Sequence, residues 1–175
     1  MKSILITGGA RSGKSRFAQD IAAKLGGTVL FVATAEPKDE EMRLRIKMHK
    51  ESRPGSWRTL EVPLRIGANI REHIGNSEIV IVDCITVLVS NVLLQADDRA
   101  ASEEIIFKEI EILIESMDSL AATFILVSNE VGLGLVPDND LGRRYRDCLG
   151  KANQMLARHA DEVHFLVAGI SIRLK

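Results

Sequence analysis

A glycine-rich segment near the start of the chain constrains the fold more than any other feature. Residues 8–15 have the sequence Gly-Gly-Ala-Arg-Ser-Gly-Lys-Ser and lie between the apolar run 3–7 and a helical pattern. In such a segment, glycines let backbone N–H groups curl around phosphate oxygens, and the following helix adds the positive end of its dipole. A chance glycine-rich turn is the alternative, but the strand before it and the helix after it favour a P-loop.

Short apolar runs alternate with amphipathic stretches along the rest of the chain. We expect strands over residues 3–7, 28–33, 57–61, 79–82, 123–127 and 162–167, and helices over 39–51, 101–120 and 141–159. This alternation predicts parallel strands with crossover helices, and the continuously apolar runs predict strands covered on both faces. Ala168-Gly169 separates the run 163–167 from a further short apolar run, 170–174, which predicts a hairpin. The fold class is therefore α/β, with a mostly parallel central sheet, helices on both faces and a C-terminal antiparallel hairpin.

The composition is typical of a folded domain and argues against several kinds of partner. The chain has 175 residues, of which 46% are hydrophobic and 27% charged, and its formal net charge is −1. We expect a single domain over residues 1–175 and no nucleic-acid partner. No apolar run approaches the ~20 residues of a membrane span, and the N-terminal run is too short for a signal peptide. Because Cys84 and Cys148 lack disulfide or metal-ligand spacing, we expect a cytoplasmic protein.

The P-loop assigns chemistry to three side chains. Lys14 would bridge the β- and γ-phosphate oxygens of a nucleoside triphosphate, and Ser15 would bind Mg²⁺. Asp83 follows the apolar run 79–82, where a carboxylate can hold Mg²⁺ or its waters opposite Ser15. An aspartate that merely caps the next helix is the alternative, but the P-loop favours the metal site.

His49 has a structural and a chemical interpretation. On a helix over 39–51, Met42, Ile46 and His49 follow helical spacing, so His49 lies along an apolar stripe. Spacing alone favours a partly buried histidine near a helix C-terminus. A neutral imidazole can also attack phosphorus and form a phosphoramidate where cations neutralise the phosphates. The surrounding cations are Arg45, Lys47, Lys50 and Arg53.

A polar loop follows the apolar run 123–127. Residues 128–134 have the sequence Ser-Asn-Glu-Val-Gly-Leu-Gly, at what should be the binding edge of the sheet. The loop is either a substrate loop or only a turn, and Glu130 is its one candidate for a general base.

Several of these segments together resemble a known family. They are residues 8–15, Arg45-Ile46-Lys47-Met48-His49, Arg53-Pro54, Trp57-Arg58-Thr59-Leu60-Glu61 and Ser128-Asn129-Glu130-Val131-Gly132. The chain resembles, nearly end to end, the bifunctional adenosylcobinamide kinase / adenosylcobinamide-phosphate guanylyltransferase family of cobalamin biosynthesis. The resemblance implies a RecA-like P-loop NTPase fold, a homotrimer, Mg²⁺ as cofactor, and ATP and GTP as substrates.

The resemblance also implies a two-step reaction. The first step phosphorylates the aminopropanol hydroxyl of adenosylcobinamide with ATP or GTP, with Lys14 as a catalytic residue. The second transfers GMP from GTP to adenosylcobinamide phosphate through a GMP-histidine intermediate, giving adenosylcobinamide-GDP. The matching histidine is His49, which reverses the preference drawn from spacing. Some members carry a second histidine where this chain has Met48.

The nucleotide contacts of the family are carried over residue by residue. They would fall on Gly8, Gly9, Ala10, Arg11, Ser12, Gly13, Lys14, Ser15, Ala33, Thr34, Ala35, Lys50, Glu51, Ser52, Arg53, Glu61 and Asp83. Two other functions remain as alternatives. One is a P-loop small-molecule kinase without nucleotidyl transfer, and the other is a nucleotide-dependent switch or ATPase module.

Overall fold

The computed structural model describes residues 2–37, 39–51, 53–95 and 99–175. Its strands are β1 (Ser3–Gly8), β2 (Val29–Ala33), β3 (Arg58–Glu61), β4 (Ile79–Asp83), β5 (Thr123–Val127), β6 (Glu162–Val167) and β7 (Ile170–Arg173). Its helices are α1 (Lys14–Leu25), α2 (Glu40–Glu51), α3 (Ile66–His73), α4 (Ile85–Gln95), α5 (Arg99–Ser119) and α6 (Asp140–His159). None of the described helices is both long enough and apolar enough to cross a membrane.

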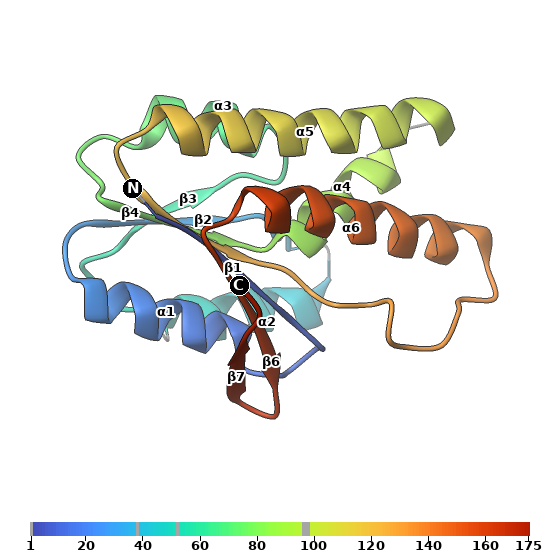
Figure 1. Cartoon of the computed structure of the whole chain (residues 1–175), viewed down its shortest axis with the longest axis horizontal. Helices are drawn as coiled ribbons and strands as arrows, with labels where there is room; N and C mark the ends of the chain where they lie inside the picture. The colour runs from blue at the N-terminus through green and yellow to red at the C-terminus, as the bar shows by residue number, and fades with distance from the viewer. Residues whose placement is uncertain (1, 38, 52, 96–98) are drawn as a thin grey trace.

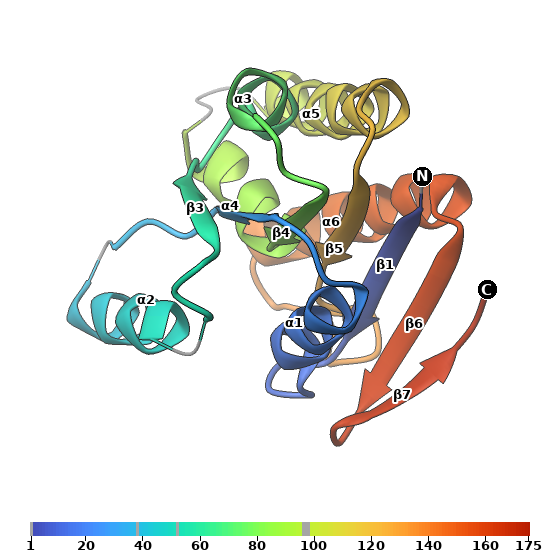
Figure 2. The same ribbon diagram turned by 90° about the vertical axis from the view of Figure 1, so that its left-hand side faces the viewer.

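The strands form one seven-stranded sheet in the order β3-β2-β4-β5-β1-β6-β7. Strands β1 to β6 pair in parallel, and β7 pairs antiparallel with β6. The α/β class, the mostly parallel sheet and the C-terminal antiparallel hairpin are therefore confirmed. Figure 2 shows the sheet crossing the molecule from β3 on one side to the β6–β7 hairpin on the other.

The apolar strands fill two cores, one on each face of the sheet. Alternate residues of a strand point to opposite faces, so Leu5 and Phe124 pack with α3, α4, α5 and α6, whereas Ile4 and Ile125 pack with α1. Figure 1 shows this layering, with α3 and α5 above the sheet and α1 below it. Helices on both faces explain why the strands are continuously apolar.

Two helices have no counterpart among the sequence expectations. The α4 segment is mostly apolar and mostly buried, so it lacks the polar face that marks a surface helix. The α3 segment is only 8 residues long.

Asp83 is the last residue of β4 and pairs in register with Ala33 and Val127. It therefore lies within the sheet, at the carboxyl ends of the strands.

Helices α3 and α5 pack at a close contact over Gly67. A Cβ atom added at Gly67 would lie 2.7 Å from the carbonyl oxygen of Ile112. Ser116 Oγ donates to the Gly67 carbonyl at 3.1 Å and accepts from Arg71 Nε at 2.8 Å, which fixes the two helices at this spacing.

Gly67→Ala tests this contact. We expect the free energy of unfolding to fall by about 1–3 kcal/mol, because the added methyl group overpacks the helix interface. Gly150→Ala on α6 is the matched control, since a Cβ there meets no atom within 4 Å; alanine should raise stability by up to about 1 kcal/mol. Urea denaturation measures both, and a neutral or stabilising Gly67→Ala would contradict the close packing.

Candidate active site

The turn at the end of β1 requires glycine. Gly8 has a φ of 147°, and a Cβ atom there would overlap the carbonyl oxygen of Leu166 on β6. Gly13 has a φ of 96° and directly precedes the first residue of α1. These positions let the backbone turn sharply from strand to helix, as a phosphate-binding loop needs.

Lys14 is held inside the loop. It is 7% exposed, and its Nζ donates to the carbonyl of Gly9 at 2.5 Å and to Ser12 Oγ at 3.5 Å. The tip of the β6–β7 hairpin supports the same loop, because Gly169 N–H donates to the carbonyl of Ser12 at 3.0 Å. The loop therefore presents a buried ammonium group on a backbone that a distant part of the chain supports.

The ends of the neighbouring strands meet beside the P-loop. Ala33 at the end of β2 pairs in register with Glu61 of β3 and Asp83 of β4. Since the carboxyl ends of parallel strands lie at one edge of a sheet, this group and the P-loop share that edge. The predicted residues from Gly8 to Ser15, Ala33 to Ala35, Glu61 and Asp83 are thus brought to one side of the molecule.

Thr34 fixes the backbone that follows Asp83. Its hydroxyl accepts from Cys84 N–H at 2.9 Å and donates to the Cys84 carbonyl at 2.8 Å. Asn91 of α4 in turn donates to the carbonyls of Thr34 at 2.9 Å and Pro63 at 3.1 Å. A buried hydrogen-bond network thereby holds the backbone directly after Asp83.

Ser15 and Asp83 have the chemistry that Mg²⁺ prefers. A hydroxyl and a carboxylate are hard oxygen ligands, and Mg²⁺ in nucleotide sites takes one or two of these plus phosphates and waters. Among the described residues, no cluster of three or more His, Cys, Asp or Glu side chains could hold a metal ion. The residues present therefore suit an ion shared with a bound nucleotide rather than an all-protein cage.

The last turn of α2 and the residue Arg53 just after the helix each contact a strand near the same edge of the sheet. Lys50 forms an ion pair with Glu61 of β3. Arg53 stacks on Phe31 of β2, with its guanidinium carbon 3.5 Å from the ring centroid. His49, in the last turn of α2, is half-buried along with Met42 and Ile46, as the stripe predicts. Ser52 lies outside the described residues.

Arg53 is a partly buried cation beside two carboxylates. Burial lowers its pKa from the ordinary value, and the nearby Asp83 and Glu61 act in the opposite direction. The guanidinium remains charged, since arginine does not lose its proton in proteins. Its Nε and Nη1 are buried and make no hydrogen bond within the described part of the chain. The side chain therefore offers donors to an anion at this edge.

The polar loop after β5 is fixed against the P-loop. Glu130 N–H donates to the carbonyl of Gly8 at 2.9 Å. Asn153 of α6 binds the loop twice, through Ser128 Oγ at 2.6 Å and the Asn129 carbonyl at 3.0 Å. Thr86 Oγ1 accepts from Asn129 N–H at 2.7 Å. These bonds fix the backbone of the loop beside the P-loop.

Sequence reasoning missed the residues that support this site. They are Asn91, Asn153, Thr86 and the hairpin tip at Gly169. One sequence signal was a polar residue within a mostly apolar segment, since Asn91 is a buried amide in the mostly apolar helix α4. Such a residue needs a buried hydrogen-bond partner, but the sequence does not say which one.

Cys84 directly follows Asp83, and its surroundings disfavour the thiolate form. Desolvation, followed by the charge of Asp83, raises the pKa of Cys84 to about 11. The thiolate is the reactive form of cysteine, so at neutral pH this thiol stays protonated.

The buried lysine in a glycine loop after β1, together with an acidic residue at the end of β4, is typical of a P-loop NTPase fold. The family model described as cobinamide kinase / cobinamide phosphate guanyltransferase matches residues 4–174. The chain belongs to this family.

Named relatives match almost the whole chain. The bifunctional adenosylcobalamin biosynthesis protein CobU of Salmonella typhimurium is 42% identical over 180 residues, covering 98% of this chain and 99% of that protein. The protein of the same name from Escherichia coli is 40% identical with the same coverage. The bifunctional adenosylcobalamin biosynthesis protein CobP of Pseudomonas aeruginosa is 44% identical over 171 residues, covering 98% of this chain and 96% of that protein.

Thr34→Val tests the network that positions Asp83. The variant keeps the volume but removes the hydroxyl, leaving the Cys84 N–H and carbonyl without that partner. We expect a loss of about 1–3 kcal/mol in the free energy of unfolding and weaker binding of Mg²⁺-ATP. Thr34→Ser, which restores the hydroxyl, should bind and unfold nearly as the wild type does. Equal behaviour of the two variants in urea denaturation and nucleotide titration would contradict this role.

Proposed function

We propose that the chain phosphorylates adenosylcobinamide with ATP or GTP and then transfers GMP from GTP to the product, giving adenosylcobinamide-GDP. One observation carries the proposal beyond family membership. The last turn of α2, which bears His49, and the following Arg53 are tied to the strand ends beside the P-loop. A nucleophile and a phosphate-binding loop on one edge are what nucleotidyl transfer to a histidine needs.

In the kinase step, the loop backbone and Lys14 stabilise charge on the γ-phosphoryl group. The hydroxyl oxygen of the substrate attacks the γ-phosphorus in line, the bond to the β-phosphate oxygen breaks, and the hydroxyl proton passes to a base. Glu130 is our candidate for that base, because its backbone is bonded to Gly8. Its carboxylate accepts from Gly132 N–H at 2.5 Å, which keeps the side chain within the loop.

In the guanylyl step, a neutral ring nitrogen of His49 attacks the α-phosphorus of GTP. The new P–N bond forms as the bond to pyrophosphate breaks, and Arg53 and Lys50 offset the phosphate charge. A phosphate oxygen of adenosylcobinamide phosphate then attacks the same phosphorus, the P–N bond breaks, and His49 is restored. Ser15 and Asp83 would hold Mg²⁺, which supplies further neutralisation of phosphate charge when bound.

The remaining predicted contacts enclose the nucleotide. The loop from Gly8 to Ser15 would surround the phosphates, while Ala33 to Ala35, Lys50, Glu51, Arg53, Glu61 and Asp83 would form the other side of the site. A kinase without nucleotidyl transfer is not favoured, since the family and the named relatives are bifunctional. A switch or ATPase module is not favoured either, because the family is described as a kinase and guanyltransferase.

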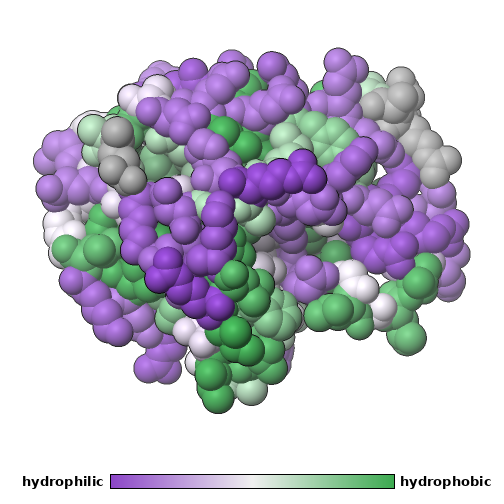
Figure 3. Space-filling model, in the orientation of Figure 1, coloured by the Kyte–Doolittle hydropathy of each residue, from purple (hydrophilic) through white to green (hydrophobic). Residues whose placement is uncertain are grey.

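We also propose that the single domain over residues 1–175 assembles as a homotrimer in the cytoplasm. Exposed apolar side chains cover the β6–β7 hairpin, where Ile170, Ile172 and Leu174 alternate along one face of an edge strand. Figure 3 shows this hydrophobic surface at the lower centre of the molecule. Contiguous exposed apolar surface of this kind is typical of a subunit interface. The free thiols of Cys84 and Cys148 suit a reducing compartment.

Lys14→Ala tests the shared P-loop. Loss of the buried ammonium group should lower kcat of the kinase step by ~10²–10³-fold, the usual cost of removing one preorganised charge-stabilising donor. Lys24→Ala, at the exposed end of the same helix, is the matched control and should retain activity. Transfer of ³²P from γ-labelled ATP to adenosylcobinamide measures both variants. Full activity in Lys14→Ala would exclude this lysine from catalysis.

His49→Ala tests the covalent step. The variant should lose the acid-labile label that the wild type retains from α-³²P-GTP, while phosphorylation of adenosylcobinamide continues. His73→Ala, an exposed histidine at the end of α3, is the control that should still be labelled. Label persisting at the wild-type level in His49→Ala would mean that another group accepts GMP.

A further inference from the structure

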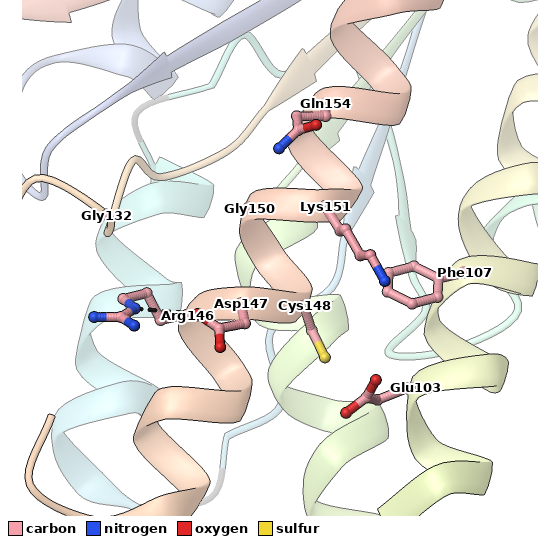
Figure 4. Close-up of a pocket in the computed structure, with 9 residues that line it drawn as sticks. All are labelled: Glu103, Phe107, Gly132, Arg146, Asp147, Cys148, Gly150, Lys151 and Gln154. Atoms are coloured by element: carbon pink, nitrogen blue, oxygen red, sulfur yellow. Dashed lines mark hydrogen bonds and ion pairs between the residues drawn. The ribbon is translucent and has the colours of Figure 1, made fainter. Parts of the chain in front are cut away.

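A groove of about 410 Å³ crosses the outer face of α6. Figure 4 shows Gly132, from the loop after β5, on one side of α6, and Phe107 and Glu103 of α5 on the other. Gly150 lies between them, and a Cβ atom added there would meet no atom within 4 Å. The missing side chain at Gly150 therefore helps to keep the middle of the groove open.

The charged side chains that line the groove are two cations and two carboxylates. Lys151 and Arg146 carry positive charge, and Glu103 and Asp147 carry negative charge. The ammonium group of Lys151 lies 4.9 Å from the centroid of the Phe107 ring, which forms an apolar wall. A surface with no net charge does not select a phosphate. Arg146 and Asp147 pair with each other at 3.3 Å. The groove therefore suits the neutral amide groups of a ligand, whose carbonyls can accept from Lys151 and whose N–H groups can donate to Glu103.

The groove also lies within reach of the P-loop. Glu130 is bonded to Gly8 through its backbone N–H, and Gly132 at the rim of the groove follows two residues later. Two residues of extended chain span at most about 7 Å. A ligand lying against Gly132 can therefore extend an arm over this short loop to the edge of the sheet where the phosphates would bind.

We propose that this groove binds the amide side chains at the periphery of the corrin ring, so that the aminopropanol arm points to the P-loop. The assignment rests on the proposed function, because the substrate is taken to be a cobinamide. The corrinoid then approaches over α5 and α6, on one face of the sheet. The nucleotide lies on the other side of the shared edge, where Arg53 and α1 pack against Phe31 and its neighbours.

Gly150→Met is the variant that fills the groove. Methionine is a better helix former than glycine and enters open space, so the fold should be preserved. We expect binding of adenosylcobinamide to weaken at least 10-fold (on the order of 1.4 kcal/mol), measured by equilibrium dialysis followed by the visible absorbance of the corrinoid. KM for adenosylcobinamide should rise by a similar factor, while KM for ATP stays unchanged. Gly150→Ala, which adds only a methyl group, should bind more nearly as the wild type does.

Ala23→Met is the control for an added methionine. Ala23 is exposed on α1, on the opposite face of the sheet, so this variant should bind adenosylcobinamide as the wild type does. Labelling with α-³²P-GTP in the absence of corrinoid checks the nucleotide half of the site in each variant. Wild-type affinity for adenosylcobinamide in Gly150→Met would overturn the groove assignment alone. A wild-type chain that fails to bind adenosylcobinamide would instead overturn the proposed function, and this inference with it.

Discussion

The parallel pairing of β1 with both β5 and β6 determines where the rest of the site can lie. At the end of β1 the backbone of Gly8 approaches Leu166 of β6 so closely that no side chain fits between them. The carbonyl of the same glycine accepts from Glu130, after β5. The P-loop is therefore held from both neighbouring strands, and the hairpin tip at Gly169 adds a third support. A loop fixed in this way binds phosphate without first being ordered.

The shared edge of the sheet explains how one nucleotide site can serve two reactions. The kinase step needs the γ-phosphoryl group beside an incoming hydroxyl, and the guanylyl step needs the α-phosphorus beside an imidazole. The last turn of α2 is attached to β3 through Lys50, and Arg53, just after the helix, contacts β2, so His49 lies near this edge of the sheet. In the proposed arrangement, the nucleotide lies on this side and the corrinoid approaches over the loop after β5. The two substrates would then meet without competing for space.

Local sequence patterns were enough to predict the sheet and the P-loop. Strands buried on both faces are continuously apolar, and a glycine-rich turn between a strand and a helix has few structural alternatives. The mostly apolar α4 escaped prediction because a helix that is buried over most of its surface has no polar face to reveal its period. The hairpin was predictable from Ala168-Gly169, but its contact with Ser12 was not, since Ser12 and Gly169 lie 157 positions apart in the sequence.

His49 shows the limit of spacing most clearly. Its place on a half-buried stripe with Met42 and Ile46 is what a structural histidine would show. Contacts with other strands, which no local pattern encodes, bring its helix toward the edge of the sheet that carries the P-loop. The family resemblance predicts that His49 accepts GMP, whereas its spacing alone favours a structural histidine.

The central claim is that His49 accepts GMP beside this P-loop. The direct measurement is peptide mapping by mass spectrometry of the wild-type protein after incubation with Mg²⁺-GTP and no corrinoid. The account predicts a GMP adduct on His49 that disappears when adenosylcobinamide phosphate is added. An unmodified protein, or GMP on any residue other than His49, would contradict it.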